Sequence, residues 1–171
     1  RIDGLHNIDK LPEKMQKSYV KETMEIFAPI ANRLGLGEIK TKLEDLSFAH
    51  LDPEKFAWVQ ENVKEKYEER KRYLQKCIPT IKRIFAKERI PYLTISYRAK
   101  SYWSTYQKLL THDMDFERIH DLVALRIVVK DIASCYKALG IIHKHYEPIS
   151  KEINDYIAKP KINGYKSLHT T

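Results

Sequence analysis

The stretch YLTISY at residues 92–97 marks the point at which the chain changes from a helical to a strand pattern. Its β-branched and aromatic residues are typical of a strand, and VALRIVV at residues 123–129 is a second apolar run of strand length. A helical stretch around residues 100–111 separates the two runs, and Asp131 is a suitable N-cap for another helix. Residues 91–171 therefore predict the first part of a mixed α/β domain.

Upstream of residue 91 the chain has the spacing of amphipathic helices and no strand pattern. Apolar side chains recur every three or four residues along 20–34 and again along 56–84, and Asp52 followed by Pro53 is typical of a helix start. We expect Pro29 to bend the first helix and Pro79 to divide the second. The predicted fold class is α+β, with an all-helical N-terminal segment followed by the mixed α/β domain.

The composition indicates a globular protein with an excess of positive charge. Of the 171 residues 43% are hydrophobic, and 31 Lys and Arg against 23 Asp and Glu give a net charge of +8. No window approaches the roughly 18 apolar residues of a membrane-spanning helix, so we expect no membrane contact. Cys77 and Cys135 form no disulfide or zinc pattern, which favours the cytoplasm. The charge excess follows residue 59 and suits polyanionic ligands, either nucleotides or nucleic acid.

The first group of candidate site residues surrounds the predicted helix at 100–111. On a helix, Lys100, Ser104 and Lys108 would form one row about 12 Å long, which matches the length of a polyphosphate. Two ammonium groups and a hydroxyl suit phosphate oxygens, and Arg98 before the helix suits a phosphate or a base. A solvated polar face explains the same spacing, and spacing alone favours that interpretation.

The second group is Asp121 and Arg126, at and within the second apolar run. An acid at the mouth of a buried strand is a natural Mg²⁺ ligand, although a cap or a partner for Arg118 is an equal alternative. Arg126, if buried, needs an acidic, phosphate or stacking partner. Strand alternation puts Asp121 and Arg126 on opposite faces, so they share a site only if Asp121 precedes the regular strand or a bulge intervenes.

The third group lies in DYIAKPKINGYKSLHTT at residues 155–171. After a turn at Asn163 and Gly164, we expect Tyr165 and His169 on one strand face, with Lys161 and Asn163 at its entrance. An aromatic ring beside a lysine and an imidazole can stack a base and bind its phosphates. An edge hairpin with an exposed tyrosine is an equally open interpretation.

These three stretches, in this order, resemble the RelA/SpoT family of guanosine tetra- and pentaphosphate, (p)ppGpp, synthetases and hydrolases. Residues 98–108 match its R-x-K-x-x-x-S-x-x-x-K pattern, and residues 155–171 are similar to its guanine-nucleotide segment. Residues 26–35 and 43–48 resemble the end of its HD-type hydrolase domain, and DGLHN at residues 3–7 stands where the family has D-R-L-H-N. The resemblance implies C-terminal helices of an HD-type domain in 1–51, a helical linker in 52–90, and the N-terminal part of a nucleotidyltransferase-like synthetase domain in 91–171.

The resemblance also implies the activity of a GTP diphosphokinase, which transfers pyrophosphate from ATP to the 3′-hydroxyl of GDP or GTP in the stringent response. It implies the catalytic Mg²⁺ ligand Asp121, and it assigns the nucleotides to two sets of residues: ATP to Arg98, Lys100, Ser104, Lys108 and Arg126, and GDP or GTP to Lys161, Asn163, Tyr165 and His169. A bifunctional parent would also hydrolyse (p)ppGpp, with Asp3 as a Mn²⁺ ligand and Asn7 in the same site. The ribosome is a further expected partner, through regions outside this chain.

Two alternatives to this activity stay open. Gly4 replaces the usual arginine, and EIND at residues 152–155 matches neither of the two common family versions, so a parent that is mainly a hydrolase is one alternative. A non-enzymatic RNA-binding module is the other, because of the basic charge. Since further acids of both sites are expected outside residues 1–171, we expect this piece alone to catalyse neither reaction.

Overall fold

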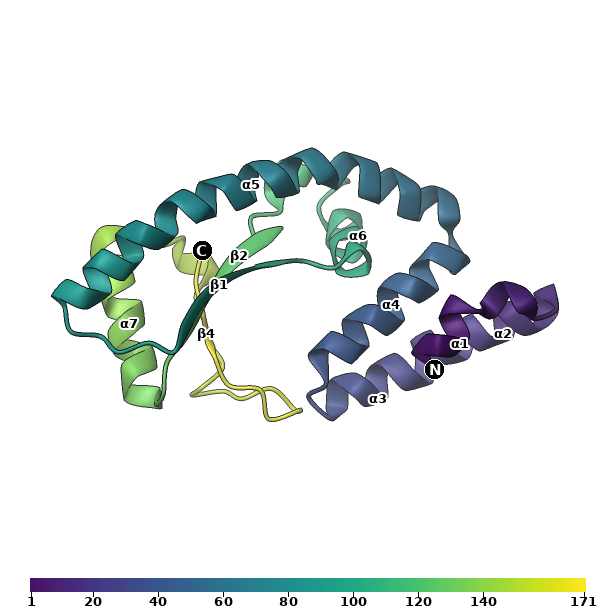
Figure 1. Ribbon diagram of the computed structural model, residues 1–171, viewed down its shortest axis with the longest axis horizontal. Coiled ribbons are helices and arrows are strands. Elements are labelled where there is room, and N and C mark those ends of the chain that lie inside the picture. The colour runs from purple at the N-terminus through teal and green to yellow at the C-terminus, as the bar shows by residue number, and fades with distance from the viewer. The chain divides into compact units, whose positions relative to one another are not determined.

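The computed structural model describes residues 1–171 and consists mainly of helices with two small antiparallel sheets (Figure 1). This confirms the predicted α+β class. Contacts within the chain divide it into two units, Arg1–Lys64 with Ser101–Phe116 and Glu65–Lys100 with Glu117–Thr171. This division is based on contacts within the chain and does not test the domain ranges 1–51, 52–90 and 91–171, which stay a prediction.

The first unit is helical and has a core of aliphatic side chains. Its elements are α1 (Ile2–His6), η1 (Ile8–Lys10), α2 (Glu13–Glu22), the π-helical turn η2 (Thr23–Phe27), α3 (Ala28–Arg33), α4 (Gly37–Leu51), the start of α5 (Pro53–Lys87) and α6 (Tyr102–Thr111). The buried core residues are Leu5, Ile8, Val20, Ala28, Ala31 and Leu43. The recurrence of apolar side chains along residues 20–34 therefore reflects real burial.

Aromatic rings form a second packed cluster in the first unit. Phe48 of α4 is 1% exposed, and its ring lies 5.0 Å from that of Tyr106 in a stacked arrangement. Phe56 and Trp103 meet Phe48 edge to face at 5.6 and 5.1 Å. These contacts fix α6 against α4 and the start of α5, because aromatic pairs of this geometry add to the effect of burial.

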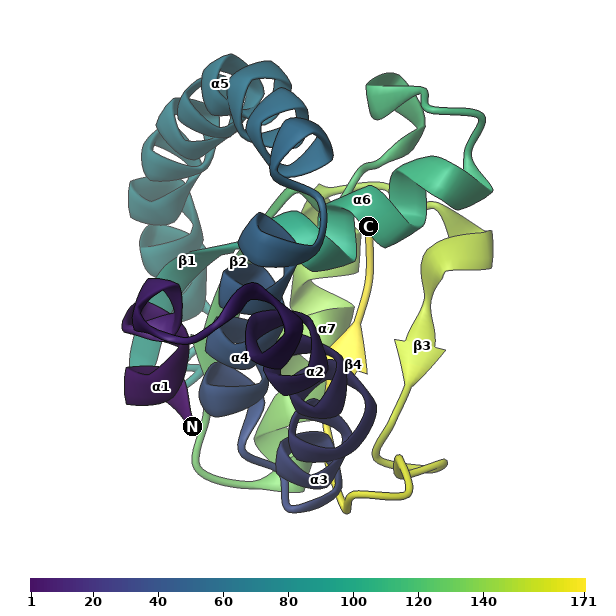
Figure 2. The same cartoon turned by 90° about the vertical axis from the view of Figure 1, so that its right-hand side faces the viewer.

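The second unit builds a two-stranded sheet covered by helices on one face. Its elements are the remainder of α5, β1 (Thr94–Ala99), β2 (Val123–Val128), α7 (Ile132–His145), η4 (Ser150–Glu152), β3 (Asn154–Asp155) and β4 (Leu168–His169), and the short turn η3 (Phe116–Arg118) precedes β2. Strands β1 and β2 are antiparallel, with Thr94 opposite Val128 and Ala99 opposite Val123. The core joins α5, the sheet and α7 through Ile81, Phe85, Ile90, Ala138, Ile95, Leu125 and Ile127. The strands β3 and β4 form a separate antiparallel pair (Figure 2).

Helix boundaries agree with the sequence at the capping residues and differ at Pro79. The carboxylates of Asp52 and Asp131 accept the backbone N–H of Lys55 and Ser134, so both predicted helix starts are confirmed. The prediction that Pro79 divides its helix is wrong, because α5 continues through it. Pro79 is exposed, while apolar residues on both sides of it pack into one core, and water can bond the carbonyl group that Pro79 leaves unpaired. None of the helices combines the length and apolar character needed to cross a membrane.

Candidate functional site

Arg98 and Arg126 lie on the face of the β1–β2 sheet that the helices leave open. In the strand register Arg98 is opposite Ala124 and Arg126 is opposite Ser96, so the two arginines are diagonal neighbours on one face. The core residues Ile95 and its partner Ile127 belong to the other face. Arg126 is exposed, so the burial that its apolar surroundings suggested does not occur. Diagonal residues of an antiparallel pair are about 7–8 Å apart, within reach of one planar ligand.

Lys100 and Asp121 form an ion pair where β1 ends and β2 is about to begin. The Nζ atom of Lys100 lies 2.7 Å from Oδ2 of Asp121, and the two side chains are 19% and 38% exposed. The backbone N–H of Lys100 donates to the carbonyl of Leu122 at 2.8 Å, which extends the strand ladder by one bond. Asp121 thus precedes the regular strand, which is the condition under which it can share a site with Arg126.

Two side chains of α5 hold the segments that carry this ion pair. The hydroxyl of Tyr67 donates to the carbonyl of Lys100, and the guanidinium of Arg70 donates to the carbonyl of Ile119. Ile119 and Leu122, which flank the acid, are fully buried. The sequence did not indicate these supports, because Tyr67 and Arg70 read only as part of an amphipathic helix and their partners lie 33 and 49 residues away.

The expected single row of Lys100, Ser104 and Lys108 does not form, because Lys100 precedes the helix. Ser101 is the N-cap of α6, its hydroxyl oxygen accepting the N–H of Ser104 at 3.2 Å, so the helical positions begin at Tyr102. Lys100 belongs to the second unit, whereas Ser104 and Lys108 belong to α6 in the first. The hydroxyl of Ser104 accepts a hydrogen bond from the Ser101 hydroxyl at 2.8 Å.

A carboxylate of α4 supports the start of α6 in the first unit. Asp45 accepts the backbone N–H of Trp103 at 2.9 Å and that of Tyr102 at 3.4 Å. Burial raises the pKa of Asp45, while these two hydrogen bonds and the charge of Lys40 act in the opposite direction. Asp45 therefore has a structural role, satisfying N–H groups that a helix start leaves without partners.

The third stretch forms a compact cluster around Tyr165 and His169. The hydroxyl of Tyr165 lies 3.0 Å from Nε2 of His169, and the Tyr156 ring lies edge-on to the imidazole at 5.1 Å. The Lys161 ammonium is 4.5 Å from the centre of the Tyr156 ring and 5.6 Å from that of Tyr165. Tyr165 is 38% exposed, so part of its ring is open to a ligand.

A turn and the hydrogen-bonded carboxylate of Asp155 shape this cluster. The predicted turn is confirmed, since the N–H of Gly164 donates to the carbonyl of Lys161 at 2.8 Å and Gly164 has a positive φ of 73°. The Asn163 side chain accepts the N–H of Tyr165 at 3.2 Å. Asp155 accepts the hydroxyl of Tyr136, and its pKa is lowered by hydrogen bonds, first of all from the N–H of Ala158. The prediction that Tyr165 and His169 lie on one strand is wrong, because β4 comprises only Leu168–His169.

The electrostatic environment of His169 links the third stretch to the other two. Partial burial lowers the pKa of His169, and the positive charges of Lys161, Arg126 and Lys100 lower it further, while the carboxylate of Asp121 raises it. The lowered pKa favours the neutral imidazole, whose Nε2 can accept the Tyr165 hydroxyl. Within the second unit, charged groups from all three stretches act on one imidazole.

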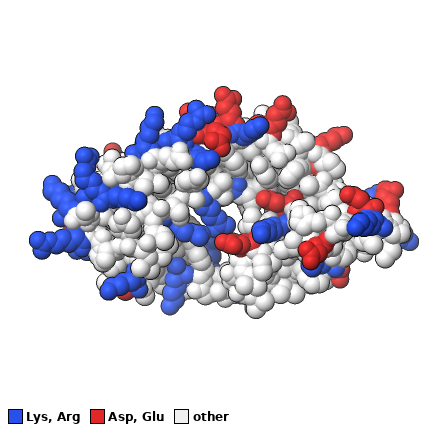
Figure 3. Space-filling model, viewed as in Figure 1, with Lys and Arg blue, Asp and Glu red and all other residues white.

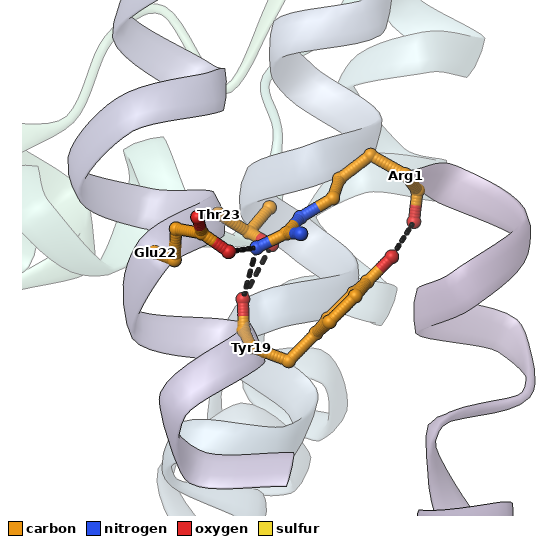
Figure 4. Close-up of polar contacts among 4 residues, drawn as sticks. All are labelled: Arg1, Tyr19, Glu22 and Thr23. Carbon is orange, nitrogen blue, oxygen red and sulfur yellow. Dashed lines mark hydrogen bonds and ion pairs between the residues drawn. The ribbon is translucent and has the colours of Figure 1, made fainter. Parts of the chain in front are cut away.

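In the first unit, Arg1 is held by the end of α2 and the turn after it (Figure 4). Its guanidinium donates to the hydroxyl of Thr23 at 2.9 Å and the carbonyl of Tyr19 at 3.0 Å, pairs with Glu22, and lies 3.6 Å from the centre of the Tyr19 ring. A Cβ atom at Gly4 would lie 1.9 Å from the Tyr19 hydroxyl oxygen. The Tyr19 ring thus occupies the space that a side chain at position 4 would need.

Asp3 lies at a pocket of about 340 Å³ in the first unit. Arg1 and Asp3 are its charged lining residues, and apolar side chains such as Ile30 and Leu43 complete the wall. Asn7 donates from its amide to the backbone carbonyl of Asp3 at 2.9 Å, and its oxygen accepts from Lys10 at 2.7 Å. The structure therefore keeps Asp3 and Asn7 adjacent, as expected, but engages the Asn7 oxygen with a lysine.

Binding of Mg²⁺ near Asp121 or of Mn²⁺ near Asp3 depends on the oxygen ligands that the chain supplies there. Across residues 1–171 no three His, Cys, Asp or Glu side chains come together as a metal site. Asp121 fits Mg²⁺ as a single accessible carboxylate, because that ion commonly takes one or two carboxylates and completes its shell with water and substrate phosphates. Asp3 and Asn7 do not supply a donor set for Mn²⁺, because they bring a single carboxylate and an amide oxygen that is already bonded to Lys10.

Sequence comparisons give this geometry a family context. A family model described as a region found in RelA and SpoT proteins matches residues 97–171. The chain is similar to a GTP pyrophosphokinase of Myxococcus xanthus, with 39% identity over 100% of this chain and 22% of that protein. It is 41% identical to the bifunctional (p)ppGpp synthase/hydrolase RelA of Mycobacterium tuberculosis, over 99% of this chain and 23% of that protein. A guanosine-3′,5′-bis(diphosphate) 3′-pyrophosphohydrolase of Aquifex aeolicus is 40% identical over 100% of this chain and 25% of that protein. The chain spans at most about a quarter of these relatives.

Proposed function

This chain belongs to the RelA/SpoT family, and from that premise we propose that it binds the donor and acceptor nucleotides of a GTP diphosphokinase. The reaction is the transfer of pyrophosphate from ATP to the 3′-hydroxyl of GDP or GTP. The observation that carries the proposal is the shared electrostatic environment of Lys100, Asp121, Arg126 and His169, because these residues come from three separate stretches of the chain. A donor and an acceptor site must adjoin in this way for a transfer reaction.

In this proposal ATP binds on the open face of the β1–β2 sheet. Arg98 and Arg126 are diagonal neighbours there, and two guanidinium planes can stack on the faces of an adenine base. Lys100 then neutralises phosphate oxygens, and the assignment of Ser104 and Lys108 to the same polyphosphate stays a prediction from the sequence motif. Since phosphoryl-type transfer depends mainly on positioning and charge neutralisation, these side chains supply most of what the donor needs.

Asp121 has two partners in succession in this proposal. Without nucleotide its carboxylate holds the Lys100 ammonium in place. A phosphate oxygen of ATP can take over Lys100, which leaves the Asp121 carboxylate as a ligand for Mg²⁺. The ion, when bound, would offset the charge that develops on the transferring phosphates. The buried neighbours Ile119 and Leu122 and the bond from Arg70 keep Asp121 at this place.

The acceptor nucleotide binds at the cluster formed by the third stretch. The exposed part of the Tyr165 ring stacks on guanine, and the His169 imidazole fixes the orientation of that ring through the Tyr165 hydroxyl. Lys161 lies beside both tyrosine rings and supplies a positive charge for the acceptor phosphates. Asn163 holds the turn in shape by accepting the N–H of Tyr165.

A second candidate activity, hydrolysis of (p)ppGpp, belongs to the first unit. Asp3 lies at a pocket with Arg1, and two of the relatives described above are named for hydrolysis. We accordingly propose residues 1–51 as the end of an HD-type domain, 52–90 as a linker, and 91–171 as part of a nucleotidyltransferase-like synthetase domain. The two free cysteines accord with the cytoplasm as its location, and the proposed ribosome contact lies in other regions of the protein.

Nucleotide titrations test the donor site directly. Calorimetry with a protein containing this chain should show Arg98→Ala and Arg126→Ala each weakening ATP binding at least fivefold, with GDP binding unchanged. The matched control is Arg33→Ala, which removes an exposed arginine from α3 and should change neither nucleotide. Equal losses of ATP and GDP in both sheet variants, or no loss of ATP in either, would contradict the proposed site.

A further inference from the structure

A tract without acidic residues runs along the second half of α5. Between Glu69 and Glu88 the sequence contains seven Lys and Arg and no Asp or Glu. Glu68 pairs with Lys71 and Glu88 pairs with Lys144, so neither of these two acids neutralises the other cations of the tract. Five exposed cations of the tract form no ion pair in the structure, and Lys82 lies on a different side of the helix from the other four. We call these four the basic ridge: Arg72, Lys76, Arg83 and Lys87.

The basic ridge faces away from the sheet and from the proposed nucleotide site. With 3.6 residues per turn and a rise of 1.5 Å, its four positions fall within about 60° of one another and extend over about 22 Å of helix. Ile81 and Phe85 on the opposite side of α5 pack into the core beneath β1 and β2, whereas Arg98 and Arg126 lie on the other face of that sheet. Figure 3 shows Lys and Arg side chains gathered along this half of α5 with few acids between them. The ridge therefore has no function in binding ATP or GDP.

A line of cations with no intervening acids complements a line of phosphates. A membrane surface fits poorly, because an interfacial helix buries apolar residues beside its basic face and the apolar side of α5 is already packed in the core. Tyr73, next to Arg72 and 64% exposed, offers an aromatic ring on which an unpaired base can stack. Tyr73 and Thr80 occupy helix positions on the same edge of the ridge, where hydroxyl groups can bond the 2′-hydroxyl that distinguishes RNA.

We propose that the basic ridge binds single-stranded RNA, through phosphate contacts to its four cations and base stacking on Tyr73. This surface is separate from the nucleotide site and does not depend on the proposed transferase activity. Four phosphate contacts to a single strand predict that raising the salt from 50 to 200 mM weakens binding about 50-fold.

Fluorescence anisotropy with a labelled 20-nucleotide poly(U) RNA tests the proposal. Changing all four ridge residues to glutamine should weaken binding at least tenfold at 50 mM salt and flatten the salt dependence. Tyr73→Ala should weaken binding at least fivefold, whereas Tyr73→Phe should keep most of the affinity and lose part of the preference for RNA. A control variant removes the same number of positive charges from exposed positions outside α5, namely Lys14, Arg33, Lys42 and Lys151, and should bind within threefold of the unchanged protein.

The outcomes separate the proposal from its competitors. Equal losses in the ridge and control variants would show that net charge alone binds RNA, and would overturn the proposal. Equal or tighter binding of single-stranded DNA of matched sequence would overturn the assignment to RNA, and ridge-dependent binding of phosphatidylserine vesicles without RNA binding would replace it by a membrane. Circular dichroism checks folding, and the double variant Arg83→Gln/Lys87→Gln, expected to lose at least threefold, applies the same test if the fourfold variant melts early.

Discussion

The ammonium of Lys100 lies 2.7 Å from the carboxylate of Asp121, and the two residues are 21 positions apart in the chain. The contact connects the end of β1 with the entrance of β2, beside the open sheet face of Arg98 and Arg126. Because the pair is partly exposed, its contribution to stability is small, about 1 kcal/mol or less. Its position beside Arg98 and Arg126 accords with the ligand-binding role that we propose for it.

Asp121→Asn should reduce pyrophosphate transfer at least about 100-fold, because a charged group that stabilises the transition state is lost. The melting temperature should fall by no more than about 2–4 °C, the shift expected for 1 kcal/mol. The exchanged variant Lys100→Asp/Asp121→Lys is the control, since it can re-form the ion pair in the opposite direction. If the exchange restored synthesis, the pair would be structural and the metal-ligand role wrong.

Tyr165→Ala should weaken GDP or GTP binding by roughly 5- to 150-fold, since base stacking is worth about 1–3 kcal/mol. ATP binding should hardly change, and Tyr165→Phe should lose much less because it keeps the ring face. Separate titrations of both nucleotides with both variants provide the measurement. Small, equal effects on ATP and GDP would favour the edge-hairpin interpretation of this segment.

The pKa of His169 should lie below 6.5 in the folded protein and respond in opposite directions to two nearby charges. Lys161→Gln removes a positive charge and should raise this pKa, whereas Asp121→Asn removes a negative charge and should lower it. NMR titration of the imidazole measures both shifts. Because the unfolded chain binds the proton more readily than the folded one, this group makes stability decrease as the pH falls from neutral through 6.5. Shifts of the same sign in both variants would contradict the shared environment.

Ser47→Ala should leave stability unchanged or raise it by up to about 1 kcal/mol, because the fully buried Ser47 hydroxyl has no hydrogen-bond partner. Thr23→Val is the matched comparison: that buried hydroxyl accepts from Arg1 and donates to the carbonyl of Tyr19. Its loss should cost about 1–3 kcal/mol. Urea unfolding of the two variants gives both values, and a larger loss for Ser47→Ala would contradict the assignment of partners.

Local patterns predicted the elements of this fold well. The strands β1 and β2, the helix α6 between them and the Asp131 cap of α7 followed from residue type and spacing alone. Asp121 also precedes the regular strand, which meets the condition for sharing a site with Arg126. These features depend on neighbours within a few positions, which is the information that periodicity and capping rules contain.

Features that depend on distant partners could not be predicted in the same way. Lys100 was assigned to a helix because its spacing from Ser104 fits one, yet its backbone bonds to Leu122 across the sheet. Tyr67 and Arg70 support the ion pair from α5, and Pro79 is tolerated within α5 because packing on both sides outweighs one lost hydrogen bond. In each case tertiary contacts, invisible to local rules, decide the outcome.

The fate of the two terminal phosphates of ATP tests the central claim most directly. A protein that contains this chain is incubated with GDP and ATP labelled separately at the β and γ phosphorus, and the nucleotide products are separated. Transfer of an intact pyrophosphate predicts that both labels appear together on the 3′ position of the guanosine nucleotide and that AMP forms in equal amount, with both signals lost in Asp121→Asn. Formation of ADP with only the γ label transferred, or labelled product undiminished in Asp121→Asn, would contradict the account.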